Sequence, residues 1–102
     1  MNNKMGLSKA EVDEIRMFVM QFSDVESVVL FGSRAKGTHK PGSDVDLAIL
    51  GDAVSYSTIN ELSYLLNEES VLPYYFDVIN VADISSSALL SHIKEYGVEF
   101  NL

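Results

Sequence analysis

The chain has 102 residues, no cysteine and a formal net charge of −8 at pH 7. A chain of this length has room for one hydrophobic core, so we expect a single domain over residues 1–102. The absence of cysteine excludes disulfides, thiolate metal sites and a cysteine nucleophile. The negative charge argues against direct binding to nucleic acid, which requires a basic face.

Apolar segments of the sequence bear on whether the chain is directed to or across a membrane. No apolar run reaches the roughly 20 residues that a membrane-spanning helix needs. Residues 1–7 lack the apolar segment of a signal peptide. We therefore expect a cytoplasmic protein with no attachment to a membrane.

The first part of the chain predicts a helix followed by a buried strand. Residues 8–11, Ser-Lys-Ala-Glu, form a capping box, and apolar residues at helical spacing extend the helix over about 9–23. The β-branched and apolar run 26–31 predicts a strand that ends at Gly32 and Ser33. Glycines and a proline follow, so any helical turn after this pair is short.

The remaining elements complete a small α/β fold. The pattern predicts a second strand over 45–50, a helix that begins with a capping box at Thr58–Glu61 and ends near residue 69, and a third strand over 74–79. A last helix, capped by Asp83 or one of Ser85–Ser87, ends at Gly97, and residues 98–102 form an extended tail. The expected order is α-β-β-α-β-α, with helices packed on a small mixed sheet.

Two aspartates open the second predicted strand. Asp44 and Asp46 are two residues apart, so their side chains project from the same face, with Cα atoms about 6.6 Å apart at about 3.3 Å of rise per residue. Two ionised carboxylates at this distance repel each other, and a divalent cation removes that conflict. Oxygen ligands without any thiolate indicate a hard ion such as Mg²⁺.

Asp77 is the candidate for a third carboxylate. It interrupts an apolar strand, where an aspartate without a partner is costly to bury. If the second and third strands are neighbours, Asp77 shares a face with Asp44 and Asp46, and the three can hold two metal ions for in-line displacement at phosphorus. The alternative is a strand residue that faces solvent.

Gly32 and Ser33 supply the second half of the predicted site. A strand that leads into a glycine turn exposes backbone N–H groups to a phosphate, and the serine hydroxyl can bind a phosphate oxygen. Three of the seven basic residues (Arg34, Lys36 and Lys40) lie in the loop between this turn and Asp44. This loop fits a small phosphorylated ligand better than a polymer, or it is a solvated loop.

The stretch FGSRAKGTHKPGSDVDLAIL, residues 31–50, resembles a known family. A Gly-Ser pair, ten further residues and an Asp-x-Asp motif are the signature of DNA polymerase beta-like nucleotidyltransferases, and the full string is similar to the minimal nucleotidyltransferase (MNT) subfamily. The resemblance extends over most of the chain. It takes in Gly32, Ser33, Arg34, Gly37, Ser43, Asp44 and Asp46, with Asp77 in the expected third strand. It implies a palm-like α/β core.

The resemblance also implies an activity and a partner. Family members bind ATP with Mg²⁺, two ions being expected, and MNT proteins often act as the antitoxin of a HEPN-type ribonuclease toxin in a type VII-like pair. In some pairs they transfer AMP to a toxin tyrosine. Gly32 and Ser33 would hold the triphosphate, with Arg34 as a further phosphate contact. Asp44, Asp46 and Asp77 would be the catalytic metal ligands.

Two alternatives remain at this stage. The same chemistry with a small acceptor would give an aminoglycoside-type nucleotidyltransferase, although the short chain favours a site completed by another protein. A non-catalytic antitoxin would neutralise its toxin by binding alone, which leaves the three acids unexplained. His92, on the last predicted helix beside its apolar stripe, is expected at the surface.

Overall fold

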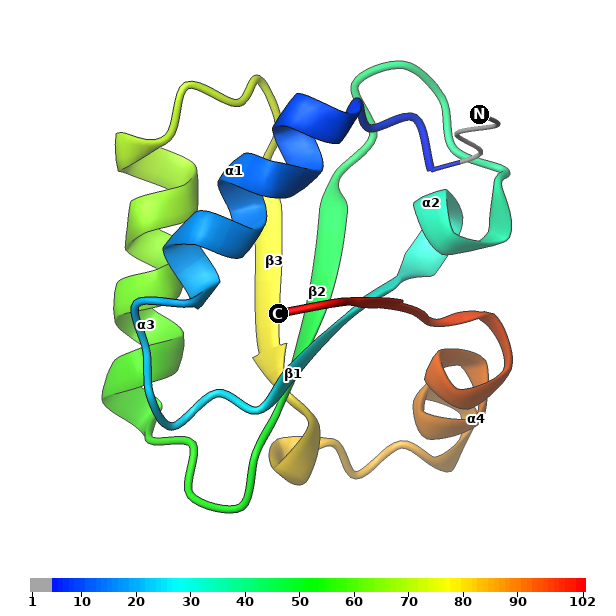
Figure 1. Cartoon of the computed structure of the whole chain (residues 1–102). Coiled ribbons are helices and arrows are strands. Elements are labelled where there is room, and N and C mark those ends of the chain that lie inside the picture. Colours follow the sequence, from blue (N-terminus) through cyan, green and yellow to red (C-terminus); the bar gives the residue numbers. More distant parts are fainter. Residues whose placement is uncertain (1–4) are drawn as a thin grey trace.

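The computed structural model describes residues 5–102, and Figure 1 shows the course of the chain. Regular structure takes up most of this range. The elements are α1 (Lys9–Val19), β1 (Ser27–Phe31), α2 (Gly32–Lys36), β2 (Val45–Leu50), α3 (Tyr56–Tyr64) with a π-helical turn at Leu65–Glu69, β3 (Phe76–Asn80) with a 3₁₀ turn at Val81–Asp83, α4 (Ser87–Tyr96) and β4 (Val98–Phe100). Within residues 5–102, no helix combines the length and the apolar character needed to cross a membrane.

The four strands form one mixed sheet in the order β3-β2-β1-β4. β1 is antiparallel to both β2 and β4, whereas β3 runs parallel to β2. The small mixed sheet with packed helices that the sequence predicts is therefore confirmed. Part of the expected C-terminal tail is strand β4, which pairs with β1 as an edge strand.

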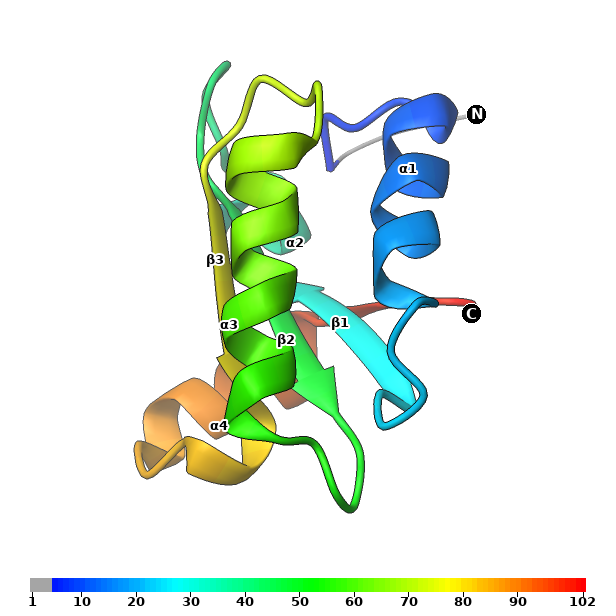
Figure 2. The ribbon, with the colours of Figure 1, turned by 90° about the vertical axis from the view of Figure 1, so that its left-hand side faces the viewer.

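The hydrophobic core lies on one face of the sheet. The helices α1 and α3 pack on this face, and α4 lies on the opposite one (Figure 2). Residues of β1, β2 and β3 alternate between the faces, as the pleat requires. The core face contributes fully buried aliphatic and aromatic side chains: Val28, Leu30, Val45, Leu47, Ile49 and Phe76, which meet Ile15, Val19, Leu62 and Leu66 from the helices. The opposite face carries Asp46 and Asp77 beside the buried residues Phe31 and Ala48.

The sequence predicts the N-cap of α1 correctly, whereas its prediction for α3 is wrong. The Ser8 and Glu11 capping box is present as predicted. The helix ends at Val19 rather than near residue 23, because the following bonds (Gln21 N–H to Phe18 O and Phe22 N–H to Val19 O) tighten its last turn.

The N-cap of α3 is Ser55, not Thr58. The Ser55 hydroxyl accepts a hydrogen bond from the Thr58 N–H, and α3 therefore begins at Tyr56. Thr58 is buried, and its hydroxyl donates to the carboxylate of Asp24 at 2.7 Å. The predicted capping box required the Thr58 side chain as the N-cap, but this side chain lies within α3 and binds Asp24 instead.

The Arg34 side chain contacts three segments of the chain that are far apart in the sequence. Its side chain is only 2% exposed. The guanidinium donates to the carbonyl oxygens of Met5 (2.8 Å) and Gly6 (3.3 Å) and, through two nitrogens, to that of Ser43 (2.9 and 3.2 Å). It also lies over the ring of Tyr74, 4.7 Å from the centroid. Arg34 thereby fixes the loop that leads into β2.

We expect Arg34→Ala to destabilise the fold by about 2–4 kcal/mol, because it removes four part-buried hydrogen bonds to carbonyl oxygens and opens a cavity where the buried side chain lay. Urea unfolding followed by circular dichroism measures this loss. Lys40→Ala, which removes an exposed cation from the same loop, is the control and should change stability by less than about 0.5 kcal/mol. Equal effects of the two substitutions would contradict the anchoring role of Arg34.

Candidate active site

The predicted acidic residues lie around the start of β2 and β3. Asp46 on β2 is directly opposite Asp77 on the parallel strand β3, so both side chains project from the same face, opposite the core. Asp44 precedes β2 and is two residues before Asp46. Asp44 and Asp77 are exposed and Asp46 is half-buried. The structure thus brings Asp46 and Asp77 into register across neighbouring strands.

These carboxylates interact electrostatically. Burial raises the pKa of Asp46 above its ordinary value, and the negative charges of Asp77 and Asp44 raise it further, while His92 and Arg34 act in the opposite direction. A bound cation would relieve this repulsion. Within residues 5–102, however, no three acidic or histidine side chains are already arranged to hold a metal ion, so a cation would have to draw the carboxylates together.

Gly32 occupies the junction between β1 and α2, beside Asp46. The preceding residue, Phe31, pairs with Asp46 across the antiparallel strands. Gly32 has φ of 80°, in the left-handed region that side chains disfavour. A Cβ atom on Gly32 would overlap the Oδ2 atom of Asp46. Glycine is therefore required here for both backbone conformation and space, and Ser33 follows as a half-buried residue of α2.

His92 of α4 also belongs to this site. Its Nε2 atom accepts a hydrogen bond of 2.8 Å from the Gly32 N–H. The imidazole packs edge-on against Phe31, with ring centroids 6.3 Å apart, and lies 5.4 Å from the ring of Tyr96. The expectation of a surface histidine is wrong, because His92 is half-buried on the site face. Its position three residues after Leu89 and four before Tyr96, on the apolar stripe of the helix, was the available signal.

Arg34 lies close to this group but is directed away from it. Its guanidinium is buried and donates to the backbone carbonyls described above. The expected phosphate contact of Arg34 thus stays a prediction that this geometry does not support. Lys36 and Lys40 are exposed, and the Lys36 ammonium lies 5.3 Å from the centroid of the Tyr96 ring.

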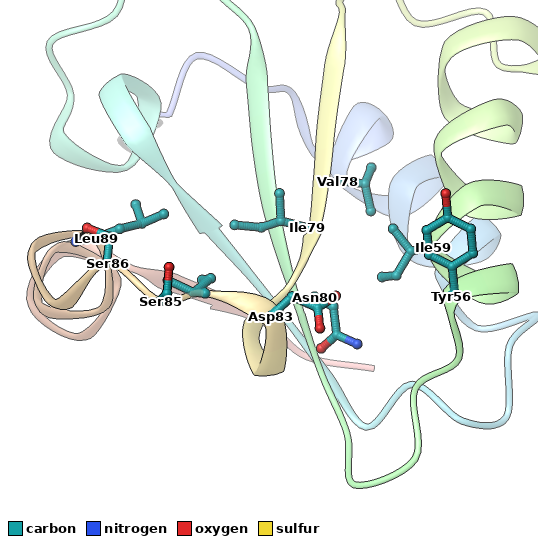
Figure 3. Close-up of a pocket in the computed structure, with 10 residues that line it drawn as sticks. Tyr56, Ile59, Val78, Ile79, Asn80, Asp83, Ser85, Ser86 and Leu89 are labelled. Carbon is teal, nitrogen blue, oxygen red and sulfur yellow. Dashed lines mark hydrogen bonds between the residues drawn. The ribbon is translucent and has the colours of Figure 1, made fainter.

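A pocket of about 430 Å³ lies at the edge of β3, between α3 and α4 (Figure 3). Tyr56 and Ile59 of α3 form one side and Leu89 of α4 the other, with Ile79 of β3 between them. Ile79 is two residues after Asp77 and therefore on the same face of the strand. The pocket is mostly apolar, and Asp83 supplies its one charged group.

The family model of the nucleotidyltransferase domain matches residues 12–99, which include the whole site. The chain belongs to the nucleotidyltransferase domain family. The expectation of a nucleotidyltransferase is thereby confirmed at the level of the family. No curated protein sequence gives a significant match.

Several solved structures of similar fold come from toxin-antitoxin complexes. A chain of a toxin-antitoxin crystal structure with AMP-PNP superposes with a TM-score of 0.73 at 22% identity, covering 88% of this chain and 72% of that one. A MntA-HepT toxin-antitoxin structure gives a TM-score of 0.70 at 18% identity, with 92% and 72% covered. The complex of tri-AMPylated Shewanella oneidensis HEPN toxin with MNT antitoxin gives 0.67 at 18% identity, with 88% and 68% covered. At these identities the likeness establishes the fold.

We expect Asp46→Asn to stabilise the metal-free fold at pH 7. The pKa of Asp46 is raised in the folded state, so its ionised form disfavours folding, and that penalty disappears as the pH falls through the folded pKa. For a half-exposed site the gain should be between about 0.2 and 1 kcal/mol at neutral pH, and it should vanish below about pH 3.8, the ordinary value for aspartate.

Thermal unfolding in EDTA at several pH values measures this effect. Asp52→Asn removes one negative charge from the exposed turn after β2 and controls for the change in net charge. An Asp46→Asn variant less stable than the natural chain at pH 7 would show that the carboxylate is held by favourable contacts instead.

Proposed function

We propose that this chain is a Mg²⁺-dependent adenylyltransferase that moves AMP from ATP to a hydroxyl group, and that the acceptor is a tyrosine of a HEPN-type ribonuclease toxin. The observation that carries the proposal is the meeting of Gly32, Asp46 and Asp77 on one face in a member of the nucleotidyltransferase domain family. A turn that exposes N–H groups beside carboxylates suits a triphosphate and its counter-ion.

Each residue has a distinct task in this proposal. The Gly32 N–H and the Ser33 hydroxyl bind oxygens of the triphosphate. Asp44 and Asp46 would hold Mg²⁺, and Asp77 would complete a second ion position. Bound there, Mg²⁺ would neutralise the negative charge of the triphosphate. Burial and, after it, the negative charges of Asp77 and Asp44 raise the pKa of Asp46, and a cation bound beside these carboxylates would offset both effects.

The transfer itself balances without a further reactant. The acceptor hydroxyl oxygen forms a bond to the α-phosphorus, the bond from that phosphorus to the oxygen bridging to the β-phosphate breaks, and diphosphate leaves. The proton of the hydroxyl passes to the carboxylate of Asp77, which is exposed and therefore accessible to an acceptor from outside. The products are the adenylylated hydroxyl and diphosphate.

The choice of a protein acceptor rests on three observations. Asp44 and Asp77 are exposed, so the reacting groups are open to a large acceptor. The pocket at the edge of β3 offers an apolar surface next to Asp77 for side chains of that acceptor. Finally, the fold matches chains from complexes of MNT antitoxins with HEPN toxins, in one of which the toxin carries three AMP groups.

We expect the purified chain to transfer label from [α-³²P]ATP and Mg²⁺ to the product of a neighbouring toxin gene. The double substitution Asp44→Ala, Asp46→Ala should lower the transfer at least about 100-fold, because it removes the carboxylates that stabilise the reacting phosphate. Mass spectrometry of the labelled partner identifies the modified residue. Asp13→Ala, Asp52→Ala removes two exposed acids away from the site and is the matched control.

Other outcomes would redirect the assignment. Complex formation without label, unaffected by the double substitution, would indicate an antitoxin that acts by binding alone. Label on an aminoglycoside in the absence of a protein partner would indicate a small-molecule nucleotidyltransferase.

A further inference from the structure

The hydrogen bond between Gly32 and His92 bears directly on nucleotide binding. The Gly32 N–H donates to His92 Nε2 at 2.8 Å. In the proposed function the same N–H donates to an oxygen of the triphosphate. A backbone N–H carries one hydrogen, so the imidazole and a phosphate oxygen compete for it.

We propose that His92 is a displaceable plug in the phosphate-binding turn. In the nucleotide-free chain, its Nε2 atom takes the place of a phosphate oxygen on the Gly32 N–H, and nucleotide binding displaces the imidazole. This inference rests on the proposed function, because it identifies His92 as the group that the triphosphate has to displace from the Gly32 N–H.

The hydrogen-bond chemistry of the imidazole supports displacement rather than joint binding. A nitrogen that accepts from an N–H carries a lone pair, so Nε2 is unprotonated in this contact. An imidazole that stayed in place would therefore keep the Gly32 N–H from an oxygen of the triphosphate.

The surroundings of His92 hold the ring in place and allow it to leave. The ring makes edge contacts with Phe31 and Tyr96. Helix α4 has no fully buried residue, unlike α1 and α3, whose buried side chains belong to the core on the other face. A rotation of His92, or a small shift of α4, consequently leaves the hydrophobic core intact.

The test is the affinity of the full chain for AMP-PNP with Mg²⁺, measured by isothermal titration calorimetry. His92→Ala should bind about 2- to 10-fold more tightly than the natural chain, the range that one net hydrogen bond represents. His92→Phe keeps the ring packing without an acceptor, so it should also bind more tightly, even if the alanine variant folds poorly. His92→Gln restores an acceptor and should bind close to the natural affinity. Lys94→Ala, an exposed change on α4, is the control.

The outcomes separate the plug from the proposed function. Tighter binding of AMP-PNP by both His92→Ala and His92→Phe, with unchanged binding of adenosine, supports the plug. If the natural chain binds AMP-PNP and both variants bind it equally or more weakly, His92 is a positioning group or a phosphate ligand, and the plug is overturned while the proposed function stands. If no form of the chain binds AMP-PNP, the proposed function fails and the plug fails with it.

Discussion

The close approach of Gly32 to Asp46 is the constraint on which the site depends. The register of β1 with β2 sets Phe31 opposite Asp46, so the next residue has to turn directly beside the carboxylate. The left-handed backbone and the lack of room for a Cβ atom restrict this position to glycine. One junction therefore places a backbone N–H, which donates to His92 in this structure, beside the Asp46 carboxylate. In the proposed function this junction serves both phosphate binding and cation binding.

One face of the sheet forms the hydrophobic core, and the opposite face carries the candidate site. Side chains such as Leu47 and Phe76 bury the core face against α1 and α3. The same strands place Asp46 and Asp77 on the opposite face, where burial and like charges raise the pKa of Asp46. A carboxylate whose pKa is shifted by burial and by charged neighbours is a candidate for a functional role.

Sequence patterns predicted the elements whose signals are local. The bounds of β2 and the capping box at Ser8 follow from apolar periodicity and local capping signals. The sequence places Asp77 beside Asp46 only on the condition that β2 and β3 are neighbours, and the structure meets that condition with a parallel pairing. The roles of Arg34 and His92 depend on partners far along the chain, 29 residues away at Met5 and 60 residues away at Gly32. Apolar spacing on α4 indicates that His92 faces inward, but no local pattern identifies the partner of either residue, because these contacts form only when the sheet and α4 are assembled. The metal and phosphate roles of the site residues stay predictions.

The most direct test is a titration of the ¹⁵N-labelled chain with AMP-PNP and Mg²⁺, followed by amide NMR. The account predicts saturable shifts of the Gly32 and Ser33 amides, accompanied by those of Asp46 and Asp77, because these groups form one site. Shifts confined to the pocket between α3 and α4, with the Gly32 amide unchanged at saturation, would contradict it. In that case the nucleotide would bind this fold without using the turn around which the site is built.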